Sequence, residues 1–239
     1  MNSSSLILVP GLMCDHTSWA PILPALSDRV DCQVVSHGEA DSLTQMAQQI
    51  LDSAPAQFDL AGHSMGGRVA LEVVRLAPER VRRLALLGTG YRAKEAGAAG
   101  EKEAQGRQAL LDVAQSQGVR AMAQVWVQNM VAPSRLADAA FIEAIVQMFE
   151  RKSADIFQRQ IKALLARPDA TEVLGQVRVP TLVMAGEFDA WASPQQHQDI
   201  ANLIPTPPPL QVVAGSGHMM MMEEPDAVAF EFVRWLQAA

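Results

Sequence analysis

Short apolar runs alternate with helical patterns along most of this chain, and this alternation limits its possible folds more than any other feature. The apolar runs are brief, and most end near glycine or histidine: Leu6–Val9, Val34–Val35, Phe58–Ala61, Leu84–Leu87, Thr181–Ala185 and Leu210–Val213. The helical patterns between them cover Trp19–Leu26, Ser42–Ser53, Gly67–Ala77, Pro194–Leu203 and Asp226–Gln237. Runs that are apolar throughout are typical of strands buried on both faces of a parallel sheet. The alternation therefore predicts an α/β fold, with a mostly parallel open sheet and helices on both faces.

One long stretch departs from this alternation. Between residues 91 and 170 we find no strand candidate, and apolar residues recur at helical spacing, as in Val119, Met122, Ala123, Trp126, Val127, Met130 and Val131. We therefore expect an all-helical insertion over 91–170 in a core formed by residues 1–90 and 171–239. The insertion holds 11 basic and nine acidic residues, whereas the remainder holds eight basic and 17 acidic residues. A solvated helical surface is the simplest explanation of this contrast.

The composition excludes several classes of protein. The chain has 239 residues, of which 49% are apolar, and a formal net charge of −7 without a dense tract of lysine and arginine. We therefore expect a globular protein that binds neither nucleic acid nor membranes. The N-terminal residues lack the features of a signal peptide, so the expected location is the cytoplasm. Cys14 and Cys32 lack the spacing of a zinc site, although one disulfide between them is possible.

The sequence Gly62-His-Ser-Met-Gly66 lies between a predicted strand and a predicted helix. A strand that enters a helix within so few residues needs a sharp turn, and small residues on either side of Ser64 leave room for it. Such a turn holds the serine hydroxyl above the edge of the sheet. We therefore predict that Ser64 is a nucleophile; the alternative is a chance serine in a glycine-rich turn.

A serine nucleophile needs a base that accepts its proton, and histidine is the usual one. Among the five histidines, His218 is the best candidate because it follows the last predicted strand in a glycine-containing loop. Asp189 follows the preceding strand and is the candidate anionic partner of the imidazole. Glu187 leaves the same strand two residues earlier and competes for this role.

An oxyanion that develops during attack on a carbonyl needs backbone N–H donors. Met65 directly follows the candidate nucleophile at a helix N-terminus, where the helix dipole also favours negative charge. The second donor is expected from the loop after the first strand, with Leu12 as the candidate because Gly11 lets the chain turn inward.

Four segments resemble the α/β-hydrolase superfamily, and most of all its small carboxylesterases and enol-lactonases: Leu8–Asp15, Gly62–Gly67, Gly186–Asp189 and Gly215–His218. The order Ser64, Asp189, His218 is that of this superfamily. The resemblance implies a helical cap between the sixth-strand and seventh-strand positions, which is where the insertion lies. Two features depart from the usual pattern. Pro10-Gly11 replaces the His-Gly of the oxyanion loop, and we expect the first oxyanion-side strand to lack the antiparallel strands that often precede it.

The resemblance also implies a function. We expect hydrolysis of a small carboxylic ester, thioester or lactone through an acyl-enzyme intermediate, without a metal or organic cofactor. One alternative is a hydrolase that cleaves a carbon–carbon bond with the same triad. Another is a ligand receptor without catalytic activity on a hydrolase scaffold, because one fold can host unrelated functions.

By analogy with the superfamily, the substrate pocket is expected between Ser64 and the cap. Its candidate lining residues are Leu12, Met13, Met65, Trp126, Met130, Met148, Phe149, Phe157, Trp191 and Met219. Adaptable methionines suit an acyl or short alkyl group. The expected partner is a small-molecule substrate. The basic cap over an acidic core also suggests an acidic acyl carrier or a substrate carboxylate, which would meet cap residues such as Arg92, Arg120 or Arg159.

Overall fold

A six-stranded parallel sheet forms the centre of the molecule. The computed structural model describes residues 4–238. The strands are β1 (Ser5–Val9), β2 (Asp31–Val34), β3 (Phe58–His63), β4 (Val81–Leu87), β5 (Thr181–Gly186) and β6 (Leu210–Val213). Their order across the sheet is β2-β1-β3-β4-β5-β6, and every neighbouring pair is parallel. The predicted α/β fold is confirmed.

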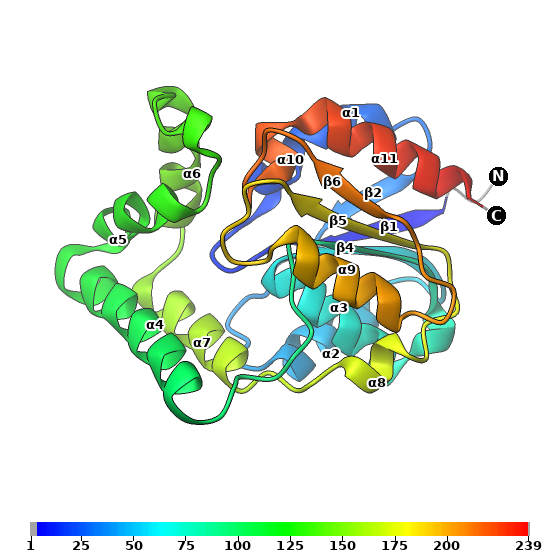
Figure 1. Ribbon diagram of the computed structural model, residues 1–239, viewed down its shortest axis with the longest axis horizontal. Helices are drawn as coiled ribbons and strands as arrows, with labels where there is room; N and C mark the ends of the chain where they lie inside the picture. The colour runs from blue at the N-terminus through cyan, green and yellow to red at the C-terminus, as the bar shows by residue number, and fades with distance from the viewer. Residues whose placement is uncertain (1–3, 239) are drawn as a thin grey trace.

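Helices cover both faces of the sheet (Figure 1). On one face lie α2 (Leu43–Ser53), α3 (Met65–Leu76), α8 (Thr171–Leu174) and α9 (Pro194–Leu203), and on the other lie α1 (Leu23–Leu26), α10 (Met220–Glu223) and α11 (Pro225–Gln237). Alternate side chains of a strand point to opposite faces. In β1, Ile7 and Val9 therefore join the apolar core beneath α2 and α3, whereas Leu6 and Leu8 join the core beneath α11.

The helical boundaries follow local sequence signals. Ser42 is the N-cap of α2, and its hydroxyl accepts a hydrogen bond from the N–H of Gln45. The expected helix over Trp19–Leu26 is divided into a 3₁₀ turn (Ala20–Ile22) and the short α1. Pro21 and Pro24 lack the N–H groups that a continuous helix needs, which accounts for the division.

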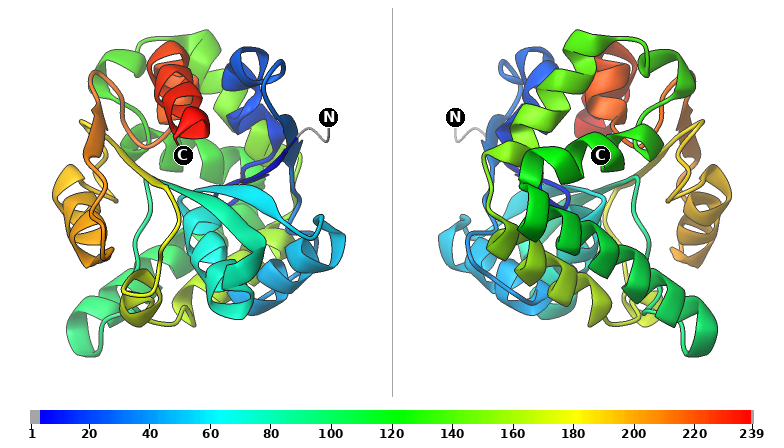
Figure 2. Two further views of the ribbon diagram at one scale, coloured as in Figure 1. Left: turned by 90° about the vertical axis from the view of Figure 1, so that its right-hand side faces the viewer. Right: turned by 90° about the vertical axis from the view of Figure 1, so that its left-hand side faces the viewer.

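A helical insert, defined here as residues 97–165, separates β4 from β5. It contains α4 (Gly97–Gln117), α5 (Val119–Trp126), α6 (Ala139–Glu150) and α7 (Ala154–Leu165), with 3₁₀ turns at Val127–Asn129 and Pro133–Arg135. Its helices, green in both views of Figure 2, cross the front of the molecule in the right-hand view. No strand occurs in this stretch, all of which the structure describes.

The carboxyl ends of the strands face the helical insert. Figure 1 shows the arrowheads of β5 and β6 directed toward the side on which α5 and α6 lie. The loops that follow β1, β3 and β4 therefore open toward the insert, which is the usual place for a ligand site in an open α/β sheet. Among the helices of residues 4–238, none combines the length and apolarity required to cross a bilayer.

Candidate active site

The turn from β3 into α3 holds Ser64 in a conformation that non-glycine residues rarely adopt. Ser64 has φ of 56° and ψ of −120°, and α3 begins at the next residue. Such strain persists only where the surrounding structure enforces it, and it often marks functional sites. A Cβ atom at Gly62 would lie 2.2 Å from the carbonyl oxygen of Gly66, and one at Gly66 would lie 2.1 Å from that of Val9. Both glycines are therefore required for the turn to pack against β1.

Three side chains from distant parts of the chain form a continuous chain of hydrogen bonds. His218 Nε2 lies 2.9 Å from Ser64 Oγ, and His218 Nδ1 lies 2.7 Å from Asp189 Oδ2. A carboxylate can only accept, so in the neutral imidazole Nδ1 carries the proton and Nε2 can accept the hydrogen of the Ser64 hydroxyl. The arrangement suits transfer of the serine proton to the imidazole.

The second oxygen of Asp189 is held by the loop in which this residue lies. Asp189 Oδ1 accepts hydrogen bonds of 2.9 Å from the N–H groups of Trp191 and Ala192. Burial of Asp189 opposes its ionisation, but His218 and these hydrogen bonds outweigh burial and hold its pKa below the ordinary value. Asp189 is therefore an anion beside the imidazole.

Glu187, the competing acid, lies elsewhere. Its carboxylate is exposed and accepts a hydrogen bond of 2.9 Å from the N–H of Gly215. It therefore contacts the loop that leads to His218 rather than the imidazole.

His63 contacts both the backbone and the ring of His218. Its Nε2–H donates a 2.8 Å hydrogen bond to the carbonyl oxygen of His218, and the two rings lie 4.8 Å apart. Burial lowers the pKa of His63 to about 3, so it is neutral at physiological pH. Its side chain thus fixes the backbone of His218 without adding charge.

The backbone N–H groups of Leu12 and Met65 are the predicted oxyanion donors. Both residues line the same cavity as Ser64. Within residues 4–238, neither N–H has an internal acceptor. Met65 is the first residue of α3, and its N–H belongs to the unsatisfied donors of a helix N-terminus. Both donors are therefore available to a ligand oxygen.

A buried carboxylate holds the loop around His218. Glu223 is fully buried and accepts hydrogen bonds from the N–H groups of Gly217 (2.9 Å) and Met219 (3.0 Å), the two neighbours of His218. It also accepts one from the N–H of Ala132 in the helical insert (2.7 Å). Glu223 therefore connects the histidine loop to the insert, a role that no sequence motif indicates.

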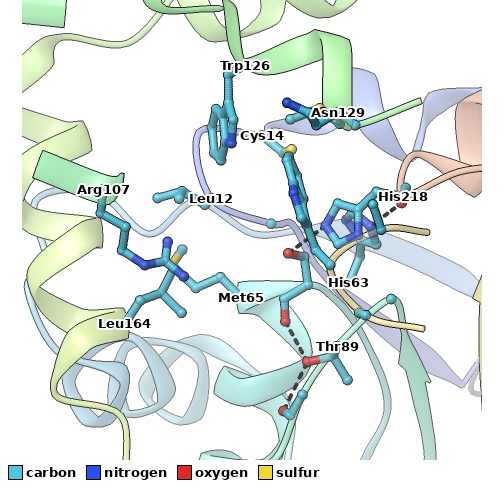
Figure 3. Close-up of a pocket in the computed structure, with 18 of the residues that line it drawn as sticks. Leu12, Cys14, His63, Met65, Thr89, Arg107, Trp126, Asn129, Leu164 and His218 are labelled. Carbon is cyan, nitrogen blue, oxygen red and sulfur yellow. Dashed lines mark hydrogen bonds between the residues drawn. The ribbon is translucent and has the colours of Figure 1, made fainter. Parts of the chain in front are cut away.

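A cavity of about 680 Å³ extends from Ser64 between the sheet and the helical insert (Figure 3). Seven of the predicted lining residues lie along it: Leu12, Met65, Trp126, Met130, Phe157, Trp191 and Met219. The indole of Trp126 stacks on that of Trp191 at 5.6 Å, and Trp191 meets the imidazole of His218 edge-on at 5.0 Å. Trp126 and Trp191 therefore form an aromatic wall of the cavity that runs from the insert to His218.

The other three predicted lining residues are not part of the cavity wall. Met13, Met148 and Phe149 are fully buried in the apolar core. The ring of Phe149 packs behind Trp126 at 5.3 Å, so it supports the wall rather than forming it. Helical spacing identifies buried positions, but it does not distinguish the side that faces a cavity from the side that faces other helices.

The arginines suggested for contact with an acidic partner are engaged elsewhere. Arg120 forms ion pairs with Glu143 at 2.7 Å and with Glu150 at 2.9 Å. Arg92 donates to the hydroxyl of Tyr91, and Arg159 donates to the carbonyl of Glu39. The cavity wall instead contains four basic residues that the sequence analysis did not select, namely Arg68, Lys102, Arg107 and Arg167.

Neither the cysteines nor the acidic residues form a metal site in the described structure. Cys14 and Cys32 are both free thiols, so the possible disulfide is not formed. Burial raises the pKa of Cys14 to about 12, which makes this cavity-lining thiol a poor nucleophile. Within residues 4–238, no three His, Cys, Asp or Glu side chains come together as potential metal ligands.

Comparison with known proteins identifies the class of this fold and site. A sequence profile of the alpha/beta hydrolase family matches residues 6–231, and the chain belongs to that family. Its enzymes include esterases and other hydrolases, which supports an enzymatic role for this chain.

One curated relative and two solved structures are similar to this chain over nearly its whole length. The chain is 28% identical over 246 residues to a pimeloyl-[acyl-carrier protein] methyl ester esterase of Photobacterium profundum, with 98% of this chain and 93% of the relative covered. A thermophilic esterase from Thermogutta terrifontis, solved with malate bound, superimposes with a TM-score of 0.84 at 24% identity and coverage of 98% and 89%. The enol-lactonase from Burkholderia xenovorans LB400 superimposes with a TM-score of 0.84 at 21% identity and coverage of 100% and 93%. These two likenesses concern the fold.

Proposed function

We propose that this protein is a serine hydrolase that cleaves a small carboxylic ester, thioester or lactone through an acyl-enzyme intermediate. The observation that carries the proposal is the alignment of Ser64 Oγ, His218 and Asp189, with contacts of 2.9 Å and 2.7 Å, at a strained turn that opens into a cavity. Membership of the alpha/beta hydrolase family and similarity to an ester-cleaving relative support the same chemistry.

The reaction follows from the roles of these groups. Ser64 Oγ attacks the carbonyl carbon while His218 Nε2 takes the hydroxyl proton, and Asp189 stabilises the imidazolium that forms. The N–H groups of Leu12 and Met65 hold the oxyanion. His218 then gives its proton to the leaving oxygen or sulfur, which departs and leaves the acyl group on Ser64. A water molecule attacks this ester with His218 as base, which releases the acid and restores the serine.

The helical insert acts in this proposal as a cap over the site. Residues 91–170 form the cap, and residues 1–90 and 171–239 form the hydrolase core. Two contacts support a coupling between them: the N–H of His218 donates to the carbonyl of Met130 at 2.8 Å, and Glu223 accepts from the N–H of Ala132. The small-molecule ester enters the apolar part of the cavity. A relative that acts on an acyl-carrier ester makes a carrier-bound substrate a second form of the same class.

The test is hydrolysis of p-nitrophenyl butyrate by the wild type and by Ser64→Ala. We expect kcat to fall by about 10⁴-fold or more in the variant, because the oxyanion donors and binding alone supply only the residual catalysis. Cys32→Ser, a change at a half-buried thiol outside the cavity, serves as the control and should retain wild-type turnover. Equal rates in the wild type and Ser64→Ala would refute the proposal.

A further inference from the structure

The cavity beside Ser64 carries an excess of positive charge. Its wall contains the four basic residues Arg68, Lys102, Arg107 and Arg167 but one carboxylate, Glu103. The chain as a whole has a net charge of −7. A cationic cavity in an acidic protein attracts anions and concentrates them at the site.

Glu103 is already shared by two of these arginines. Its oxygens accept hydrogen bonds of 2.7 Å from both terminal nitrogens of Arg167 and one of 3.0 Å from Nε of Arg107, whose Nη2 also lies 2.9 Å from the same oxygen. Arg167 also donates to the carbonyl oxygens of Arg92 and Leu164. The single carboxylate is therefore shared by two arginines, and Nη1 of Arg107 has no acceptor within residues 4–238.

Arg68 has no anionic partner among the described residues. Within residues 4–238 its guanidinium donates one hydrogen bond, from Nη1 to the carbonyl oxygen of Arg92, at 2.9 Å. Burial lowers the pKa of Arg68 to about 9, and the positive charge of Arg167 adds to this effect. Glu103 and Asp169 act on Arg68 only through space, without a direct ion pair. A guanidinium in this position is stabilised by an anion brought by a ligand.

Arg68 places its positive charge close to Ser64. Arg68 lies in the first turn of α3, its backbone N–H donates a 3.4 Å hydrogen bond to the carbonyl oxygen of Ser64, and both residues line the same cavity. Its Nη2 lies so close to Gly90 that a Cβ atom there would be 2.4 Å away. The neighbouring Thr89 donates a 2.7 Å hydrogen bond to the carbonyl of Ser64. Figure 3 shows Arg107 reaching from the insert into the same cavity, between Leu164 and Met65.

We propose that the substrate carries a carboxylate in addition to its ester bond, and that Arg68 and Arg107 bind this carboxylate while Ser64 attacks the ester. The inference rests on the proposed serine hydrolase function and defines its substrate class. A planar guanidinium with free N–H groups matches the two oxygens of a carboxylate. The carboxylate lies on the acyl side or on the alcohol side of the ester, and the test below separates the two.

The test uses pairs of esters that differ only in charge. On the acyl side, monomethyl esters of α,ω-dicarboxylic acids with about four to eight carbons are compared with methyl esters of monocarboxylic acids of the same length. On the alcohol side, acetates of ω-hydroxy acids are compared with acetates of simple alcohols. Acid release is followed by pH-stat titration. We expect kcat/KM of the charged ester to exceed that of its neutral partner by about 10- to 100-fold at the best length on one side.

Substitutions then assign this preference to residues. Arg68→Met and Arg107→Met should each reduce the charged-to-neutral ratio of kcat/KM toward one. Arg120→Met is the matched control, because Arg120 is an exposed arginine of the insert that pairs with Glu143 and Glu150 outside the cavity. It should keep the wild-type ratio. Thermal melting followed by circular dichroism checks that each variant is folded.

A measurement on the wild type alone makes the test independent of variant folding. The dicarboxylate of the preferred length should inhibit hydrolysis of the neutral ester competitively, and its diamide should inhibit at least about tenfold more weakly. The inference is overturned if charged esters show no preference at any length, or if the preference survives both arginine substitutions. Neutral esters report the proposed function separately, because their turnover requires Ser64 but no carboxylate.

Discussion

Glu223 offers a sharp test of how the fold positions His218. Its buried carboxylate accepts three backbone N–H groups, two of which flank His218 and one of which belongs to the helical insert. Burial raises its pKa above the ordinary value despite these donors. In Glu223→Gln the amide keeps one acceptor oxygen and turns an NH₂ group toward at least one N–H donor. In Glu223→Ala all three donors lose their acceptor.

The expected cost follows from this count. An unsatisfied buried donor costs about 1–3 kcal/mol, so Glu223→Gln should lower the free energy of unfolding by about 1–3 kcal/mol. In Glu223→Ala three N–H donors lose their acceptor and a space is left by the side chain, but the cost of burying a carboxylate is removed. We therefore expect the free energy of unfolding to fall by about 3–5 kcal/mol. The adjacent Glu224 is partly exposed and pairs with Arg135 at 3.2 Å, so Glu224→Gln should cost less than about 1 kcal/mol.

Urea unfolding measures these free energies, and hydrolysis of p-nitrophenyl butyrate measures the effect on the site. We expect kcat to fall in the order wild type, Glu223→Gln, Glu223→Ala, because the loop that carries His218 loses its support. KM should change less than kcat, since Glu223 does not line the cavity. The reasoning is refuted if Glu223→Gln is as stable and as active as Glu224→Gln.

Three further predictions concern the same site. Asp189→Asn should lower kcat by about 10⁴-fold in the ester assay, whereas Glu187→Gln should change it by less than about threefold, and the reverse ranking would contradict the assignment of the acid. The pKa of Asp189 is lower in the folded protein than in the unfolded chain. Its ionisation therefore stabilises the folded state at pH values above the pKa of an unfolded aspartate, and this stabilisation is lost as the pH falls through the lowered pKa. The unfolding free energy of the wild type should therefore fall more steeply than that of Asp189→Asn from about pH 5 to about pH 3, and parallel curves would count against this linkage. Gly62→Ala places a Cβ atom 2.2 Å from the carbonyl oxygen of Gly66, so it should lower the melting temperature strongly or prevent folding, and a wild-type melting curve would be the contrary result.

Local patterns predicted the central sheet well because its strands are buried on both faces. β1 is a continuous apolar run bounded by Pro10, and its predicted position coincides with the observed strand to within one residue. The edge strand β2 was placed less accurately: Val34–Val35 was expected, and the strand covers Asp31–Val34. Its alternate residues Asp31 and Gln33 are exposed, so an edge strand lacks the apolar signal of a central one.

The arrangement of the candidate site was partly predictable for a topological reason. Parallel strands place their carboxyl ends at one edge, so residues that follow β3, β5 and β6 converge there. Proximity in space of Ser64, Asp189 and His218 therefore follows from the order of elements. Their catalytic roles stay a prediction until the variants are measured.

Other features of the site depend on contacts that local patterns do not encode. Glu223 accepts a hydrogen bond from the N–H of Ala132, which lies 91 residues away in the chain. Arg68 offered one signal, since it lies in the first turn of the helix that follows Ser64. Its lack of an ion pair, however, depends on how the insert distributes its own charges. The same holds for Phe149, whose place behind Trp126 depends on the packing of α6.

The central claim is that Ser64 is the nucleophile, and covalent labelling tests it most directly. The wild-type protein is treated with a fluorophosphonate, and the adduct is located by mass spectrometry of the intact chain and of its peptides. The account predicts one adduct per chain, on Ser64, and none in Ser64→Ala. Ester hydrolysis by a protein that acquires no adduct, or an adduct on a different residue, would contradict it.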